Sequence, residues 1–395
     1  MATTTIRRPR AHRGYAMLGT IALLGTVTAA ALTALGTASA NRPRTGDTAA
    51  VLAQAKQALI SRAATDTNHP GSLPCPDAVT QIPGSNVPND GIADLLAGTA
   101  CPSNLGRLPW RTLGLPDLRD ADGERLWYLL APAYQDSPAR VINPGTSGQI
   151  TAYECPDEPP AAGVWPCAQP RALAATPWVA VVFAPGKILD GQRRDGARAN
   201  DHAQYLESYN AADPLRLRMA GSTHNDQIAV IAPDDLFALV QRRVANEVQT
   251  ALQAYFAATA GQGTARLPWP ATVCTTSTQC AAAAYAPPLP ATARGHLPSD
   301  DADLNQFMQA QGMAWFDQNH WRTTFTYTLD AGCADPAAGA GCGGAFAALP
   351  ASPLPPGTTV VGGNGALIPP GTRIVIAFAG VAGGAAKSRI AFAFQ

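Results

Sequence analysis

The sequence lacks the common catalytic motifs. It contains no G-x-S-x-G nucleophile elbow, no H-E-x-x-H zinc motif, no Walker loop and no dinucleotide-binding fingerprint. It also lacks net charge, because 28 basic side chains balance 28 acidic ones. No overall electrostatic field therefore attracts nucleic acid. We expect a protein that is not an enzyme and that has no nucleic-acid partner.

Charge is absent altogether from one long segment near the N terminus. Residues 15–40 carry no charged side chain, whereas Arg7, Arg8, Arg10 and Arg13 lie just before them. As a helix, these 26 residues would extend about 39 Å, enough to cross a hydrocarbon core of about 30 Å. The arginines hold the preceding end in the cytoplasm. The pattern predicts a single-pass inner-membrane protein whose bulk is periplasmic or extracellular.

Two interpretations of this segment remain open. Residues 13–18, where Gly14 precedes Tyr15, resemble the end of a type IV prepilin leader, in which Gly and then an aromatic residue precede a retained apolar helix. Residues 38–40, Ala-Ser-Ala, instead match a signal-peptidase site, and cleavage there would release a soluble secreted or periplasmic binding protein starting at Asn41. The apolar segment is longer than an ordinary signal core of about 7 to 15 residues, which favours the retained helix.

The resemblance to type IV pilins and type II secretion pseudopilins has several implications. It implies processing between Gly14 and Tyr15, a membrane helix used in assembly, and other pilin-like subunits as partners. Major pilins carry Glu at the fifth position after the processing site, where this chain has Gly19. Some minor pilins and the tip pseudopilin also lack that Glu. The resemblance therefore implies a minor or tip subunit of a pilus or pseudopilus.

The pattern after residue 40 predicts an α+β fold. Apolar side chains recur at helical spacing over residues 48–64 and 235–260. Uncharged, Val-rich residues 178–184 predict a buried strand, and residues 228–232 a second one. Two further strands are expected to close the chain as a hairpin, at residues 374–378 and 390–394.

The second half of the chain echoes the first. Leu73-Pro74 recurs as Leu267-Pro268, and Trp127 recurs as Trp321, both at an offset of 194 residues. Equal offsets at independent positions indicate an internal repeat, although turns coinciding in a Pro-rich chain are the competing explanation. We expect two duplicated modules, each a helix with an antiparallel sheet. The expected domains are a leader at 1–14, a transmembrane helix at 15–40, a first module at 41–232 and a second at 233–395.

Eight cysteines follow the predicted membrane segment. An even number on the oxidising side of a membrane predicts disulfides. A zinc site is disfavoured, because the sequence has no C-x-x-C and no His at metal spacing from a Cys pair. Pairing of sequence neighbours predicts four bonds: Cys75 with Cys101, Cys155 with Cys167, Cys274 with Cys280, and Cys333 with Cys342.

One loop carries the side chains that a hard cation prefers. Asn86, Asn89, Asp90 and Asp94 supply oxygen atoms, and Gly91 allows a tight turn. Calcium takes about six to eight oxygens in a flexible loop, so this spacing suits it. The same Asn-Asp-Gly sequence is also typical of a plain turn. No cofactor is expected elsewhere, and calcium at this loop is the one candidate.

Overall fold

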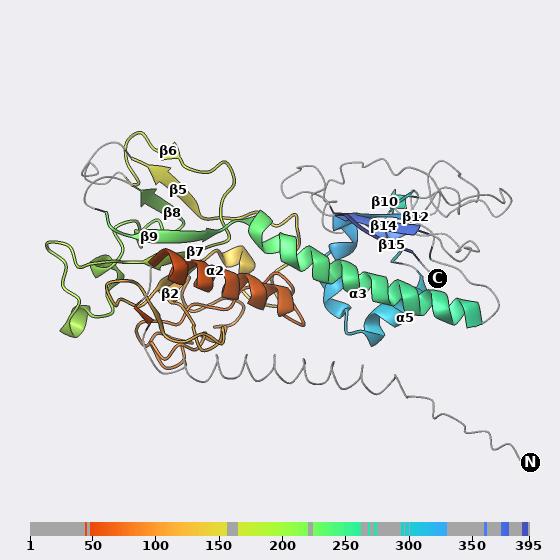
Figure 1. Ribbon diagram of the computed structural model, residues 1–395, viewed down its shortest axis with the longest axis horizontal. Helices are drawn as coiled ribbons and strands as arrows, with labels where there is room; N and C mark the ends of the chain where they lie inside the picture. The colour runs from red at the N-terminus through yellow and green to blue at the C-terminus, as the bar shows by residue number, and fades with distance from the viewer. Residues whose placement is uncertain are drawn as a thin grey trace, which may run out of the picture.

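A computed structural model describes most of the chain between residues 44 and 393 (Figure 1). The described residues are 44–45, 48–155, 165–219, 224–261, 268, 272–274, 294–295, 297–299, 301–329, 359–361, 373–378 and 389–393. The expected leader, its processing site at Gly14 and Tyr15, and the apolar segment 15–40 lie outside them. Within the described ranges, no helix is both long and apolar enough to cross a membrane.

The first unit is a helix packed on a four-stranded antiparallel sheet. Helix α2 (Thr48–Thr65) buries one face, with Ala55, Leu59 and Ala63 fully covered. The sheet has the order β2 (Leu105–Arg107), β4 (Trp127–Leu130), β7 (Ala180–Ala184) and β9 (Gln227–Ile231). Every residue of β4 and β7 is buried, which explains their uncharged sequences. Burying a Leu such as Leu59 contributes about 1.5–3 kcal/mol.

Smaller elements surround this sheet. Strand β5 (Thr151–Glu154) lies between β6 (Arg171–Ala172) and β8 (Arg216–Met219), antiparallel to the first and parallel to the second. Strand β1 (Arg44–Thr45) pairs in parallel with β3 (Leu118–Arg119). The first unit also contains the short 3-10 helices η1 (Pro132–Tyr134), η2 (Gly196–Arg198) and η3 (His202–Gln204).

Helix α3 (Pro233–Gly261) joins the two halves of the molecule. Figure 1 shows it extending from the first unit along the second. Near its start, Phe237 lies in the first core, where its ring centroid is 6.3 Å from that of Tyr134. Near its end, Tyr255 lies 6.3 Å from Phe307 of α5 (Ala302–Ala310) and donates a hydrogen bond to Asp301 (3.1 Å). The domain boundary expected at residues 232 and 233 therefore falls at a helix that contributes to both cores.

The second unit also contains a four-stranded antiparallel sheet. Its strands lie in the order β11 (Arg294–Gly295), β12 (Phe325–Leu329), β14 (Arg373–Phe378) and β15 (Arg389–Ala393). In both four-stranded sheets, neighbouring strands thus occur in the order in which they appear along the sequence. Helix α6 (Ala314–Gln318) and η4 (Trp321–Thr324) precede β12, and β10 (Thr272–Cys274) pairs with β13 (Thr359–Val361). The predicted α+β class with antiparallel sheets is confirmed. Trp127 and Trp321 are both fully buried, but Trp127 begins a strand whereas Trp321 lies in η4.

Candidate functional site

Two of the four expected disulfides lie within the described residues. Cys75 is bonded to Cys101, and Cys155 is bonded to Cys167. Of Cys274, only the backbone in β10 is described, and Cys280, Cys333 and Cys342 lie outside the described residues. The chain therefore has oxidised cysteines in the first unit, paired between sequence neighbours.

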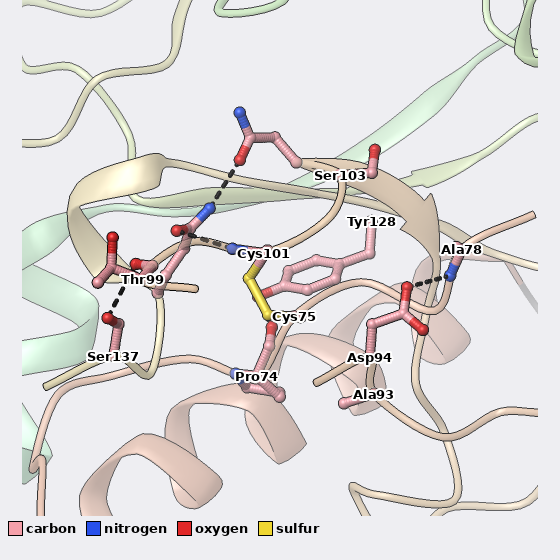
Figure 2. The surroundings of a disulfide bond; sticks show 12 residues. Pro74, Cys75, Ala78, Ala93, Asp94, Thr99, Cys101, Ser103, Tyr128 and Ser137 are labelled. Atoms are coloured by element: carbon pink, nitrogen blue, oxygen red, sulfur yellow. Dashed lines mark hydrogen bonds between the residues drawn. A yellow bond between two sulfur atoms is a disulfide. The ribbon is translucent and has the colours of Figure 1, made fainter. Parts of the chain in front are cut away.

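The first disulfide is built into the core of the first unit. Figure 2 shows it beside the ring of Tyr128, whose hydroxyl donates to the Pro74 carbonyl at 3.3 Å. The Gln135 side chain accepts a hydrogen bond from the Cys101 N–H at 3.2 Å. Burial raises the pKa of Tyr128 well above its ordinary value, so its hydroxyl acts as a donor. The disulfide therefore has a structural role: it closes the loop of residues 76–100, and the Tyr128 contact ties the start of this loop to strand β4.

Within that loop, the expected calcium ligands make hydrogen bonds to the loop itself. The Asp94 carboxylate accepts from the N–H groups of Ala78 (3.2 Å) and Asn86 (2.8 Å). The Asn86 amide donates to the Ala93 carbonyl at 3.0 Å. Asn89 has a left-handed backbone (φ 58°), and its amide donates to the Val79 carbonyl at 3.1 Å.

Two aspartates organise the turn in the middle of the loop. The carboxylate of Asp90 accepts the N–H of Ile92 at 2.8 Å. Asp77, which the sequence did not single out, lies at the centre of the loop and accepts from the N–H groups of Asn89 (2.9 Å) and Gly91 (2.7 Å). Across the chain segments that the structure describes, no group of three or more His, Cys, Asp and Glu side chains could hold a metal ion.

Asp77 is almost completely buried, at 1% exposure. Burial raises the pKa of its carboxyl to about 6, against the lowering effect of the Gly91 and Asn89 N–H groups, and the negative charges of Asp90 and Asp94 add to the rise. The loop thus gathers three carboxylates around backbone N–H donors. Its polar side chains serve to hold the turn.

A groove of about 640 Å³ lies between the two units. One wall comes from the end of α2 and the loop after it, together with Asp136 and Pro138 of the first unit. The other wall comes from the turn before α6 and from α6 itself, including Gly312, Ala314 and Gln318. Volumes of about 300–1,000 Å³ are typical of small-ligand sites. We regard this groove as the candidate functional site.

Asp66 terminates α2 at the edge of the groove. Its carboxylate accepts from the N–H groups of Asn68 (3.0 Å) and His69 (2.8 Å), and it pairs with Arg62 at 2.5 Å. Burial acts to raise its pKa, but the hydrogen bonds from His69, Arg62 and Asn68 outweigh burial and hold the pKa below its ordinary value. Asp66 is therefore an ionised, structurally engaged side chain.

Asp136 is held less closely. One carboxylate oxygen lies 3.3 Å from Nδ1 of His69, and the other lies 3.7 Å from a guanidinium nitrogen of Arg62. Charge-assisted hydrogen bonds are ordinarily about 2.7–2.9 Å long, so both contacts are long. The Asp136 side chain is 35% exposed and lines the groove. Its carboxylate retains capacity to accept hydrogen bonds from a ligand.

Several contacts fix the two walls relative to each other. Asn319, just after α6, accepts the N–H of Ile142 at 2.8 Å, and its carbonyl accepts from the Asn143 amide at 2.8 Å. Arg243 of α3 donates to the carbonyls of Ala64 (2.9 Å) and Asp66, and its guanidinium lies 5.8 Å from the Trp315 ring. The groove is therefore preformed by hydrogen bonds between the units.

No protein-family model, curated protein or solved structure matches this chain. Its function must be argued from its own residues. Sequence reasoning missed the groove because its walls come from segments about 250 residues apart. The nearest signal was the end of α2, where Arg62 and Asp66 lie at i,i+4 spacing before His69 and Pro70.

Proposed function

We propose that this chain is a membrane-anchored, pilin-like structural subunit that takes part in the assembly or tip formation of a type IV pilus or type II secretion pseudopilus. The observation that carries the proposal is the placement of α2. This helix begins at Thr48, shortly after the charge-free segment 15–40, and its apolar face packs on an antiparallel sheet. A helix that follows a membrane span and covers a sheet is the architecture that the pilin resemblance implies.

The proposal includes duplication of the exported module. Its support is that both four-stranded sheets are antiparallel and have their strands in chain order, and that a long helix precedes each of them. Strands β4, β7 and β9 would then correspond to β12, β14 and β15. The offset of 194 residues places Trp321 four residues before β12, whereas Trp127 begins β4, so the repeats would differ in the connection that enters this strand.

The N-terminal residue of the mature protein tests the proposal directly. A processed pilin-like subunit should begin at Tyr15 and remain in the membrane fraction. A protein released by signal peptidase should begin at Asn41 and be soluble. Edman sequencing or top-down mass spectrometry of the purified protein distinguishes these outcomes, and a mature N terminus at Asn41 would refute the proposed anchor.

Assembly behaviour provides a second test. A subunit with Gly19 in place of Glu offers no carboxylate to its neighbour's terminal amine. Burying that amine unpaired in a membrane bundle costs several kcal/mol. We expect this protein not to polymerise alone and to co-purify with Glu-bearing subunits in mild detergent. Leu18→Arg should abolish co-purification, whereas Leu239→Arg, at an exposed position of α3, should not. Homogeneous filaments of this protein alone would contradict a tip role.

The groove favours a second candidate function. A preformed cavity with polar and charged lining residues is typical of a binding protein. Under this alternative, the chain is a secreted or periplasmic binding protein released after Ala40. The same determination of the mature N terminus decides between the two.

A further inference from the structure

The charges that line the groove are unequal. Among the described residues that line it, two carboxylates, Asp66 and Asp136, face one guanidinium, Arg62, with no Lys and no second Arg. Arg62 pairs with Asp66 at 2.5 Å, whereas its distance to Asp136 is 3.7 Å. The Arg62 guanidinium thus pairs mainly with Asp66. Of the two carboxylates, Asp136 has the weaker neutralising contact.

The geometry around Asp136 leaves room for a further donor. The nearer of its two charged or polar contacts is Nδ1 of His69, at 3.3 Å, which is long for a hydrogen bond to a carboxylate. The Asp136 side chain is also 35% exposed. An ionised carboxylate has about four acceptor positions, and a cation placed at 2.7–2.9 Å would form a stronger pair than either existing contact. The backbone of Asp136 is fixed by its N–H, which donates to the Leu73 carbonyl at 3.0 Å. The acceptor is therefore positioned before any ligand arrives.

The rest of the groove suits an extended chain more than a small free ion. The exposed residues Asn68 and Gln318 lie on opposite walls, and their amides can both donate to and accept from peptide groups. Gly312 and Ala314 on the second wall are also exposed, and these small residues take up little of the groove. The space beside Gly312 is open, because an added Cβ there would meet no atom within 4 Å. A length of backbone can therefore lie between the walls.

We infer that this groove binds a Lys or Arg side chain carried on an extended peptide segment, with the Asp136 carboxylate as the group that recognises the cation. The walls are joined by Asn319 and Arg243, so binding requires little rearrangement. The inference does not depend on whether the mature chain begins at Tyr15 or Asn41. Its failure would leave the proposed pilin-like function standing.

Calorimetric titration of the full-length protein in mild detergent tests the inference. The probe is the peptide acetyl-Ser-Ala-Lys-Ala-Ser-amide, and the matched control peptide carries norleucine, which lacks the ammonium group. We expect the Lys peptide to bind at least about tenfold more tightly than the norleucine peptide, and its affinity to fall as salt is raised. Titration with n-butylammonium separates the cation from the peptide. Equal affinity for n-butylammonium and the Lys peptide would overturn the assignment to a peptide segment.

Variants locate the site. Asp136→Asn keeps the shape and removes the charge, so it should weaken binding of the Lys peptide about tenfold. Asp213→Asn is the matched control, because Asp213 is also 35% exposed and likewise lies near an Arg, Arg216 at 3.3 Å, but away from the groove. Ala314→Arg leaves Asp136 intact and adds a competing cation on the exposed opposite wall, so it should weaken binding as well. Unchanged affinity in both groove variants, or no detectable binding of the Lys peptide to the unaltered protein, would overturn the inference.

Discussion

Asp77→Asn should change the pH dependence of stability in a defined direction. The pKa of Asp77 is raised from 3.8 to about 6 in the folded protein. The folded state therefore binds the proton more tightly than the unfolded chain does between about pH 4 and pH 6, and the free energy of unfolding falls as pH rises through this interval. A shift of about 2 units corresponds to about 3 kcal/mol. Below and above the interval, the contribution of Asp77 is constant.

The Asn variant cannot ionise, so it should lack this fall. It also has only one side-chain oxygen, whereas the two oxygens of Asp77 accept from Asn89 and Gly91. The lost acceptor costs about 1 kcal/mol, and this cost does not vary with pH. The stability of the variant relative to the unaltered protein should therefore rise by about 3 kcal/mol between about pH 4 and pH 7.

Urea denaturation followed by tryptophan fluorescence at several pH values measures this difference. Titrations of groups that do not interact with Asp77 are common to both proteins and cancel in the comparison. Asp195→Asn serves as the control, because Asp195 is exposed and its side chain makes no helix-capping hydrogen bond. If the stability curves of Asp77→Asn and the unaltered protein run parallel to within about 0.5 kcal/mol, the argument from burial and neighbouring charge is wrong.

Three further predictions concern the first unit. Replacing Cys75 and Cys101 together by Ala should lower the free energy of unfolding by about 3–4 kcal/mol in urea denaturation, because the bond closes a loop with a sequence separation of 26; an unchanged midpoint would contradict this. Gly106→Ala should sharply lower the melting temperature, because its Cβ would lie 2.3 Å from the Asp77 carbonyl oxygen; normal melting would show that β2 can move away from this segment. Asp226→Asn should raise the free energy of unfolding at neutral pH, because burial and the charge of Glu207 raise the pKa of Asp226 in the folded state. Ionisation of Asp226 then favours the unfolded chain, so the gain should shrink as pH falls towards the ordinary Asp pKa. A gain that is independent of pH would exclude ionisation as its cause.

The regular elements of the fold followed from local pattern. The predicted helix at 48–64 is α2, and the helix predicted at 235–260 is α3, because an apolar stripe at helical spacing requires a surface to cover. The Val-rich strand was predicted at 178–184 and found at 180–184 because uncharged, β-branched residues fit a sheet buried on both faces. The expected closing hairpin pairs as β14 and β15.

Features made by distant residues escaped prediction. Asp77 precedes the Asn-Asp-Gly turn by more than ten residues, so its acceptance of two N–H groups there depends on the path of the loop rather than on a local motif. The parallel pairing of β5 with β8 joins segments separated by more than 60 residues. The groove requires the end of α2 to face α6, an arrangement set by the packing of α3. Local propensity carries no information about such contacts.

The sharing of α3 has a consequence for the order in which the chain can fold. A ribosome delivers residues from the N terminus, so α2 and the first sheet are complete in sequence before α3 exists. Until residues 233–245 emerge, Lys56 lacks its ion pair with Asp235 (2.8 Å), the Ala64 carbonyl lacks the Arg243 donor, and Tyr134 lacks the ring of Phe237. Nascent chains arrested before α3 should therefore remain protease-sensitive and available to chaperones, and the first unit should become resistant only when the helix that begins the second unit has been synthesised.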